Sequence, residues 1–294
     1  MTDQSLYVPP KEHPFAEYVR ILGRGKSGSR SLSEAEARTA FGMILRGEAL
    51  ELQIGAFLML LRVKEESPEE LAGFVQACRA HLLPPTTGVQ ADLDWSSYAG
   101  KRLQHPWYIL SMLLLADAGY RVFVHGCAGH TAGRLYTETA FREVGLHVAG
   151  SWEDTARQLD GFGLSYLSLD IFCPKLAELV QLKPLLGLRS PVNTLTRMLN
   201  PLGAAASLQS IFHPAYARLH QEADALLQQP AAMVFKGESG EVEIKPNANT
   251  RVSILRDGQL SEFEIPRVIT DRVAAVPSPS VAPLRALWQG SVED

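Results

Sequence analysis

The residues of this sequence that could do chemistry on an anion are basic side chains gathered in three short segments. Arginine and lysine carry positive charge and donate several hydrogen bonds, so clusters of them bind phosphate and carboxylate groups. The candidate residues for binding phosphate or nucleic acid are Lys101, Arg102, His130, Arg134, Lys183, Arg189 and Arg197.

The first segment is a turn in which Lys101 and Arg102 follow Gly100. Side-chain charge at such a turn suits phosphodiesters, which need no tight cradle of backbone amides. A solvated basic turn would have the same sequence, and both interpretations stay open. Trp107 or Tyr108 could stack on a base, although aromatic side chains more often belong to a core.

The second segment follows the His125-Gly126 pair, which ends a short β-rich run. We predict a helix over residues 132–144, which places His130 and Arg134 at its start. Backbone N–H groups at a helix N-terminus favour a phosphate. His125 itself belongs either to a cleft or to the hydrogen-bonded structure.

In the third segment, a helix ends just before Arg189, and a second helix, capped by Ser190, runs to a stop at Asn200-Pro201. Lys183, Arg189 and Arg197 then either line one wall of a cleft or are solvated helix charges. The sequence leaves both arrangements open.

Two carboxylates, Glu241 and Glu243, alternate with the apolar residues Val242 and Ile244. Alternation with period two is typical of a strand that has one face in solvent. We therefore predict a solvent-facing hairpin strand here, and no metal site.

Composition and charge point to an ordinary globular protein, which we expect in the cytoplasm. The chain has 294 residues, a formal charge of −4, and three well-separated cysteines without a CxxC pair, so neither a disulfide framework nor a zinc site is expected. No apolar run reaches the roughly 18 residues of a membrane span. Between residues 95 and 142, five bases face two acids, which would allow a local positive surface on an acidic protein.

The fold class we predict is α/β. Residues 1–85 have helical periodicity, with Ser33 and Ser67 as helix caps, and residues 84–88 form a Pro/Gly-rich boundary. Beyond it, strands and helices alternate, which indicates a mainly parallel sheet. Hairpins over residues 241–265 would form one edge of that sheet, and a tail over residues 273–294 would be loosely ordered.

The stretch KLAELVQLKPLLGLRSPVNTLTRMLNP, residues 175–201, resembles the signature of the anthranilate phosphoribosyltransferase family, in which a Leu-Gly-x-Arg turn leads into a helix ending at Asn-Pro. This family belongs to the nucleoside phosphorylase II superfamily. The resemblance implies that residues 174–199 return to the helical domain of residues 1–85. The α/β domain would then comprise residues 86–173 and 200–272.

The segments that carry the chemistry of this family depart from its pattern. Its Gly-Thr-Gly-Gly-Asp loop for phosphoribosyl pyrophosphate is replaced by the Gly100-Lys101-Arg102 turn, and its magnesium-organising Asp by Val242. Lys183 replaces an Arg that binds the anthranilate carboxylate. The residues of the substrate cleft that remain, as a vestige, are Gly100, His125, Gly126 and Glu243. We therefore expect no catalytic residue, cofactor or metal.

This combination is similar to the YbiB-type branch of the superfamily. The resemblance implies a homodimer that binds DNA or RNA through backbone contacts, with the dimer contact in helices of residues 14–81. The alternative is a glycosyltransferase that transfers a pentosyl group, with Mg²⁺ and a phosphoribosyl substrate.

Overall fold

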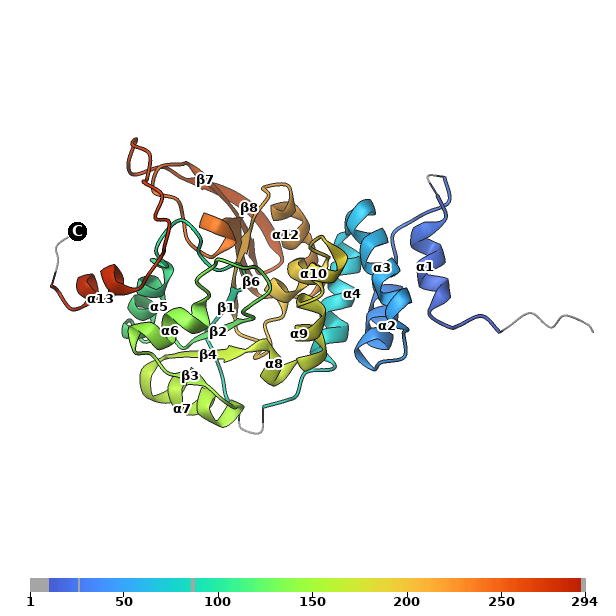
Figure 1. Ribbon diagram of the computed structural model, residues 1–294, viewed down its shortest axis with the longest axis horizontal. Coiled ribbons are helices and arrows are strands. Elements are labelled where there is room, and N and C mark those ends of the chain that lie inside the picture. Colours follow the sequence, from blue (N-terminus) through green and yellow to red (C-terminus); the bar gives the residue numbers. More distant parts are fainter. Residues whose placement is uncertain (1–10, 26, 86–87, 292–294) are drawn as a thin grey trace, which may run out of the picture.

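The computed structural model describes residues 11–25, 27–85 and 88–291. Four helices form a bundle at one end of an elongated molecule (Figure 1). They are α1 (Ala16–Gly23), α2 (Glu34–Leu45), α3 (Glu51–Lys64) and α4 (Pro68–Arg79). The predicted caps are present, because Ser33 and Ser67 each accept a hydrogen bond from the backbone N–H three residues later in a capping box.

The rest of the chain is built on one eight-stranded sheet in the order β3-β4-β2-β1-β5-β6-β7-β8. The first six strands in this order are parallel, and β7 and β8 close the edge as an antiparallel hairpin. The predicted α/β class is confirmed. The strands are β1 (Leu93–Ser97), β2 (Val122–Gly126), β3 (Val148–Ala149), β4 (Leu164–Ser168), β5 (Ala206–Ile211), β6 (Ala231–Lys236), β7 (Thr250–Arg256) and β8 (Gln259–Ile265).

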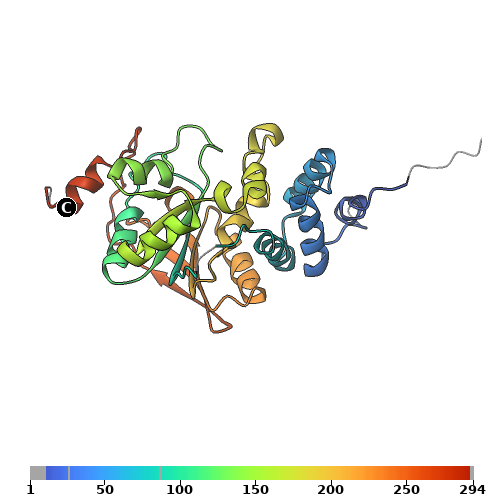
Figure 2. The same ribbon diagram turned by 90° about the horizontal axis from the view of Figure 1, so that it is seen from below.

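Helices cover the sheet and link it to the bundle (Figures 1 and 2). They are α5 (Tyr108–Asp117), α6 (Thr137–Val144), α7 (Trp152–Phe162), α8 (Leu169–Phe172), α9 (Pro174–Val180), α10 (Lys183–Leu186), α11 (Val192–Leu195), α12 (Tyr216–Leu226) and α13 (Ala282–Trp288), with short 3₁₀ turns η1 (Thr196–Met198) and η2 (Glu238–Gly240). No helix among the described residues is long and apolar enough to cross a membrane.

Residues 183–199 contact the bundle. Arg79 of α4 donates from Nε to the Leu199 carbonyl at 2.8 Å and from its Nη2 to the Met198 carbonyl at 3.1 Å. Side chains of the bundle and of residues 176–199 share one hydrophobic core. The division into domains itself stays a prediction.

Three local predictions are wrong. The helix predicted from residue 132 begins at Thr137, so His130 and Arg134 lie in the preceding loop, whose Gly129 and Gly133 take positive φ. Residues 241–245 form no strand. Ser190 caps no helix, because α11 begins at Val192 behind Pro191 without a side-chain cap.

The segment predicted as a loosely ordered tail makes specific contacts over its described part. Val276 N–H donates to the Leu103 carbonyl at 2.8 Å, and His105 Nδ1 lies 2.8 Å from the Ser280 carbonyl oxygen. Leu284 of α13 is fully buried.

Candidate anion-binding cleft

Three loops meet at the carboxyl ends of the parallel strands, where α/β proteins place their binding sites. They are residues 98–107 after β1, 127–136 after β2 and 237–249 after β6. The ends of β1 and β2 lie so close that a Cβ on Gly126 would stand 2.2 Å from the Ser97 carbonyl oxygen. Only glycine fits at this position, so the close approach of the first two loops depends on it.

The loop after β1 forms a small nest of backbone amides that is filled by the protein's own Glu241. The N–H groups of Ala99 and Gly100 donate to Glu241 Oε1 at 2.7 and 2.5 Å. The Ser97 hydroxyl donates to Oε2 at 2.7 Å. Gly100 takes a φ of +67°, which favours glycine, and Glu241 is only 1% exposed. An internal carboxylate therefore occupies the position where such a nest would hold an external anion.

Lys101 forms a buried ion pair with Glu243. Its Nζ lies 2.5 Å from Glu243 Oε1, and the lysine is fully buried. Tyr108 N–H donates to the other carboxylate oxygen at 3.0 Å. Burial raises the pKa of Glu243, and the Lys101 charge opposes this shift. In this conformation Lys101 is not at the surface, where a phosphate could reach it.

The same carboxylates do not fit a magnesium–pyrophosphate site. The oxygens of Glu241 and Glu243 are engaged by amides, a hydroxyl and an ammonium group. Val242 stands between them and cannot ligate, and no group of three His, Cys, Asp or Glu suited to a metal exists among the described residues.

Five of the predicted cationic or titratable residues lie within electrostatic range of one another. They are His130, Arg134, Lys183, Arg189 and Arg197. Burial lowers the pKa of Lys183, and the positive charges of Arg189 and Arg134 lower it further. Burial likewise lowers the pKa of His130 to about 4, and the positive charges of Arg189, Lys183 and Arg197 contribute to this shift. Uncompensated positive charge of this kind favours an anion.

Two members of this cluster also hold loops in place. Arg134 donates from its Nη1 to the carbonyls of Ala99 and Gly100 at 3.0 and 2.9 Å. Arg197 is buried and donates to the carbonyls of Ser210 and Gly240 at 2.6 and 2.8 Å. In both residues Nη1 is therefore engaged by backbone carbonyls, whereas Nη2 makes no hydrogen bond among the described residues.

Lys183 and Arg189 are the more available charges. Lys183 Nζ donates to the Thr131 hydroxyl at 3.1 Å and is only partly buried. The partly buried Arg189 has no hydrogen-bond or ion-pair partner among residues 11–25, 27–85 and 88–291. Arg102 is exposed.

His125 is a buried structural residue. Its Nδ1 lies 2.7 Å from the Tyr98 hydroxyl, and its Nε2 lies 3.2 Å from Asp94 Oδ1. The side chain is fully buried, so it does not line a cleft.

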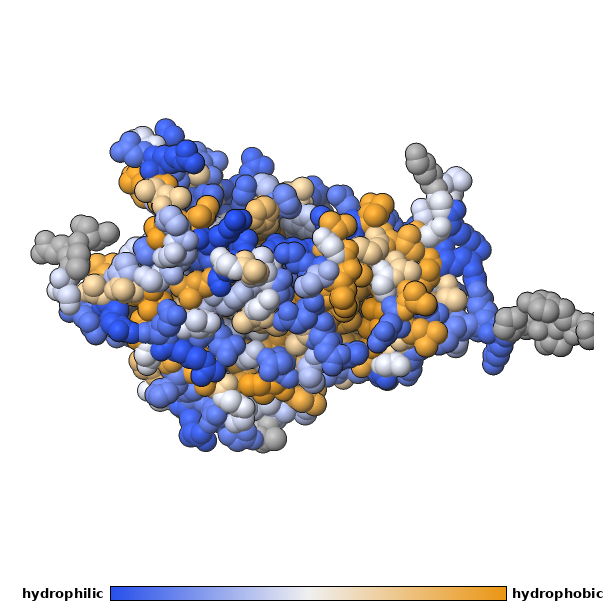
Figure 3. All heavy atoms as spheres, viewed as in Figure 1, coloured by the Kyte–Doolittle hydropathy of each residue, from blue (hydrophilic) through white to orange (hydrophobic). Residues whose placement is uncertain are grey.

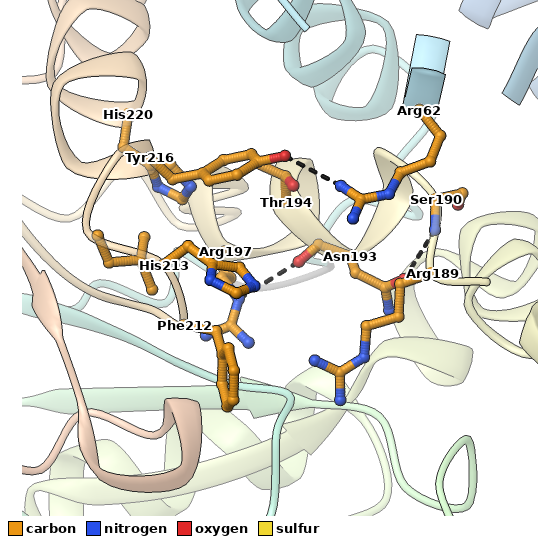
Figure 4. Close-up of a pocket in the computed structure, with 11 residues that line it drawn as sticks. Arg62, Arg189, Ser190, Asn193, Thr194, Arg197, Phe212, His213, Tyr216 and His220 are labelled. Atoms are coloured by element: carbon orange, nitrogen blue, oxygen red, sulfur yellow. Dashed lines mark hydrogen bonds between the residues drawn. The ribbon is translucent and has the colours of Figure 1, made fainter. Parts of the chain in front are cut away.

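Sequence reasoning missed a cavity next to the cluster, between α3, α11 and α12 (Figure 4). Its volume is about 120 Å³. The residues that line it are Arg62, Arg189, Ser190, Asn193, Thr194, Arg197, Ile211, Phe212, His213, Tyr216 and His220. No signal local to Arg62 or His220 identifies them, because they are 158 positions apart in the sequence.

Comparisons with known proteins agree with this architecture. Residues 16–82 match the helical bundle domain of a glycosyl transferase family. An anthranilate phosphoribosyltransferase of Rhizobium rhizogenes is 30% identical over 237 residues, which cover 80% of this chain and 69% of that protein. The chain belongs to the anthranilate phosphoribosyltransferase-like glycosyltransferase family 3. The resemblance inferred from residues 175–201 is confirmed.

Two other proteins illustrate the similarity. The Escherichia coli protein named "Uncharacterized protein YbiB" is 28% identical over 259 residues, 85% of this chain and 79% of that protein. The crystal structure of anthranilate phosphoribosyltransferase from Thermus thermophilus matches with a TM-score of 0.77 at 21% identity, over 96% of this chain and 84% of that one. At this identity the structural match shows the fold alone.

Proposed function

We propose that this protein is a nucleic-acid-binding homodimer that does not transfer phosphoribosyl groups. The observation that carries the proposal is the Glu241 carboxylate in the amide nest after β1. A pyrophosphate would have to displace this carboxylate, and Lys101 with Glu243 forms a second internal pair beside it. These contacts support the loss of the phosphoribosyl pyrophosphate loop inferred from the sequence.

The remaining charges favour a phosphate backbone as ligand. Lys183 and Arg189 are partly exposed, and Arg102 is exposed. Long cationic side chains at a cleft neutralise phosphates without reading bases, so binding would depend on salt and little on sequence. Nothing in this mode distinguishes DNA from RNA.

An apolar surface on α3 and α10 supports the homodimer. Leu52, Val63 and Leu185 are 88%, 84% and 85% exposed, and the apolar side chains gather over these two helices on one face of the molecule (Figure 3). A Cβ on Gly55 of α3 would lie 4.0 Å from Leu186 of α10, so the two helices are neighbours. We infer that a second copy covers this face, through the N-terminal helices and α10.

Fluorescence anisotropy with labelled oligonucleotides of unrelated sequence tests the binding. Affinity should fall steeply between about 50 and 200 mM salt and should vary little between sequences. Lys183→Gln and Arg189→Gln should each reduce the salt slope by about one. Arg38→Gln, at an exposed position on α2, is the matched control. Absence of binding at low salt would rule out the proposal.

The named activity of the Rhizobium relative favours one alternative, a transferase acting on an unidentified phosphoribosyl substrate with Mg²⁺. Such a transferase would retain Gly100, His125, Arg189 and Glu243. Heat unfolding in the presence of phosphoribosyl pyrophosphate and Mg²⁺ separates the two functions. We expect no stabilisation, whereas a clear rise in Tm would favour the transferase.

A further inference from the structure

The cavity between α3, α11 and α12 is lined by three arginines and contains no acidic side chain among the described residues that line it. Arg62 enters from the bundle, and Arg189 and Arg197 enter from the loop before α11 and from η1 (Figure 4). Arg62 is held in place because its Nη1 donates to the Tyr216 hydroxyl of α12 at 3.1 Å. Three guanidinium groups from separate elements therefore converge on one small space.

Neutral hydrogen-bond donors add to these charges. Asn193 Oδ1 accepts from the Ser190 N–H at 3.3 Å, which leaves the Nδ2 donors of Asn193 for other partners. The Thr194 hydroxyl also lines the cavity. Such a set of donors matches an oxyanion.

His220 contributes a feature that distinguishes one oxyanion from another. It is 1% exposed and lines the cavity. Gln209 Nε2 donates to the Asp224 carboxylate at 2.9 Å, so Gln209 Oε1 is the atom that faces His220 Nδ1, at 2.8 Å. His220 Nδ1 must then carry the proton, and Nε2 keeps a bare lone pair. Nε2 has no hydrogen-bond partner among the residues described here.

We propose that this cavity is an orthophosphate site that discriminates against sulfate. Near neutral pH orthophosphate keeps at least one P–OH group, which can donate to His220 Nε2 while the other oxygens accept from the arginines. Sulfate is fully deprotonated and would turn a lone pair toward that buried acceptor, which leaves the acceptor unpaired.

The volume of the cavity and the protonation state of the anion restrict the possible ligands further. A volume of about 120 Å³ is below the roughly 300–1,000 Å³ of sites for larger ligands, so the cavity fits one small group and not a nucleoside. A terminal phosphomonoester that has lost both protons also lacks a P–OH group. Free orthophosphate should therefore bind better than the phosphorylated end of a strand.

Heat unfolding of the full chain in phosphate, sulfate and chloride at equal ionic strength tests selectivity, and calorimetric titration with phosphate and sulfate gives the affinities. We expect phosphate to raise Tm above both other salts and to bind at least about tenfold more tightly than sulfate, because an unpaired buried acceptor is costly. A 5′-phosphorylated dinucleotide should compete poorly. Equal effects of phosphate and sulfate, or none, would overturn the proposal.

Substitutions of residues that line the cavity test whether phosphate binds there. Arg62→Gln should weaken phosphate binding by about 10- to 100-fold, as expected for a lost charged hydrogen bond, whereas Arg38→Gln should not. His220→Gln should reduce the ratio of phosphate to sulfate affinity. Should that variant fail to fold, Thr194→Val, which removes a donor from the cavity and keeps its charge, should weaken phosphate binding by several-fold. Unchanged phosphate affinity in both Arg62→Gln and Thr194→Val would contradict the assignment.

This inference does not rest on the proposed function. Arg62 is outside the residues assigned to nucleic acid, so Arg62→Gln should leave oligonucleotide binding intact, and each proposal can fail alone.

Discussion

At the residue scale, the Glu241 side chain occupies the amide nest that would otherwise bind an external anion. Its carboxylate accepts from two backbone amides and one hydroxyl inside the protein. Hydrogen bonds to a charged group each contribute about 1.5–3 kcal/mol. The charge of this side chain should therefore matter for stability as well as for ligand exclusion.

Glu241→Gln should lower the free energy of unfolding by about 1–3 kcal/mol, because an amide is a weaker acceptor and brings an N–H₂ group against the donors of the nest. Chemical denaturation measures the loss. Glu69→Gln, at an exposed position in the first turn of α4, should change stability by only a few tenths of a kcal/mol. Equal stability of the two variants would show that the nest does not need the charge.

Acidification should remove the stability that two buried histidines contribute. Burial lowers the pKa of His130 to about 4 and that of His220 to about 3, whereas the unfolded value is about 6.5. The unfolded chain therefore takes up these protons first. The stability that the two groups contribute is complete above about pH 6.5 and falls as the pH decreases toward 4.

Urea midpoints at pH 7 and pH 5 check this expectation. His130→Gln should lose less stability than the unsubstituted protein over the same interval, because one of the two depressed groups is gone. An identical loss would exclude His130 as a source of the effect.

At the scale of elements, β1 and β2 depend on one glycine for their close approach at the site. Gly126→Ala should destabilise the protein by more than about 1 kcal/mol, because the new Cβ would stand 2.2 Å from the backbone oxygen of Ser97. Gly161→Ala, in α7 with nothing within 4 Å of its added Cβ, should stabilise by about 0.5–1 kcal/mol. Thermal unfolding of both variants gives the comparison, and a shift in the same direction would contradict it.

Elements with local signals could be predicted from the sequence, and those set by tertiary contacts could not. The caps at Ser33 and Ser67 and the turn between β7 and β8 are encoded by a few adjacent residues. The late start of α6 and the loop around Glu241 depend instead on partners far away in the chain.

The candidate site was predictable to the same extent. The family signature that surrounds Lys183 and Arg189 made them candidates for cleft charges, but the sequence did not decide between a cleft wall and a solvated helix surface. The burial of Lys101 could not, since it depends on Glu243, which lies 142 positions later. Alternation of Glu241 with apolar neighbours indicated a solvent-facing strand, whereas the side chain is buried because it supplies the charge that the nest requires.

At the scale of the whole molecule, the apolar face of α3 and α10 is the surface that assembly should cover. Leu52→Glu and Leu185→Glu introduce a charge at positions 88% and 85% exposed. Both should halve the mass in solution, because a charge buried at an interface without a partner costs several kcal/mol. Light scattering after gel filtration measures the mass.

Leu114→Glu supplies the control, since it changes a side chain 60% exposed on α5, far from this face in the fold. A monomeric unsubstituted protein, or variants that keep the full mass, would contradict assembly through α3 and α10.

Glu241 competes with free anions for the amide nest, and its covalent attachment to the chain favours it. A side chain fixed within reach of its partners acts at an effective concentration of millimolar or above, without the cost of bringing two molecules together. Free nucleotides and pyrophosphate must displace the Glu241 carboxylate to reach the amides of Ala99 and Gly100. The protein should therefore stay insensitive to changing levels of such metabolites at this position, so that polymeric ligands meet the same surface whatever the nucleotide supply.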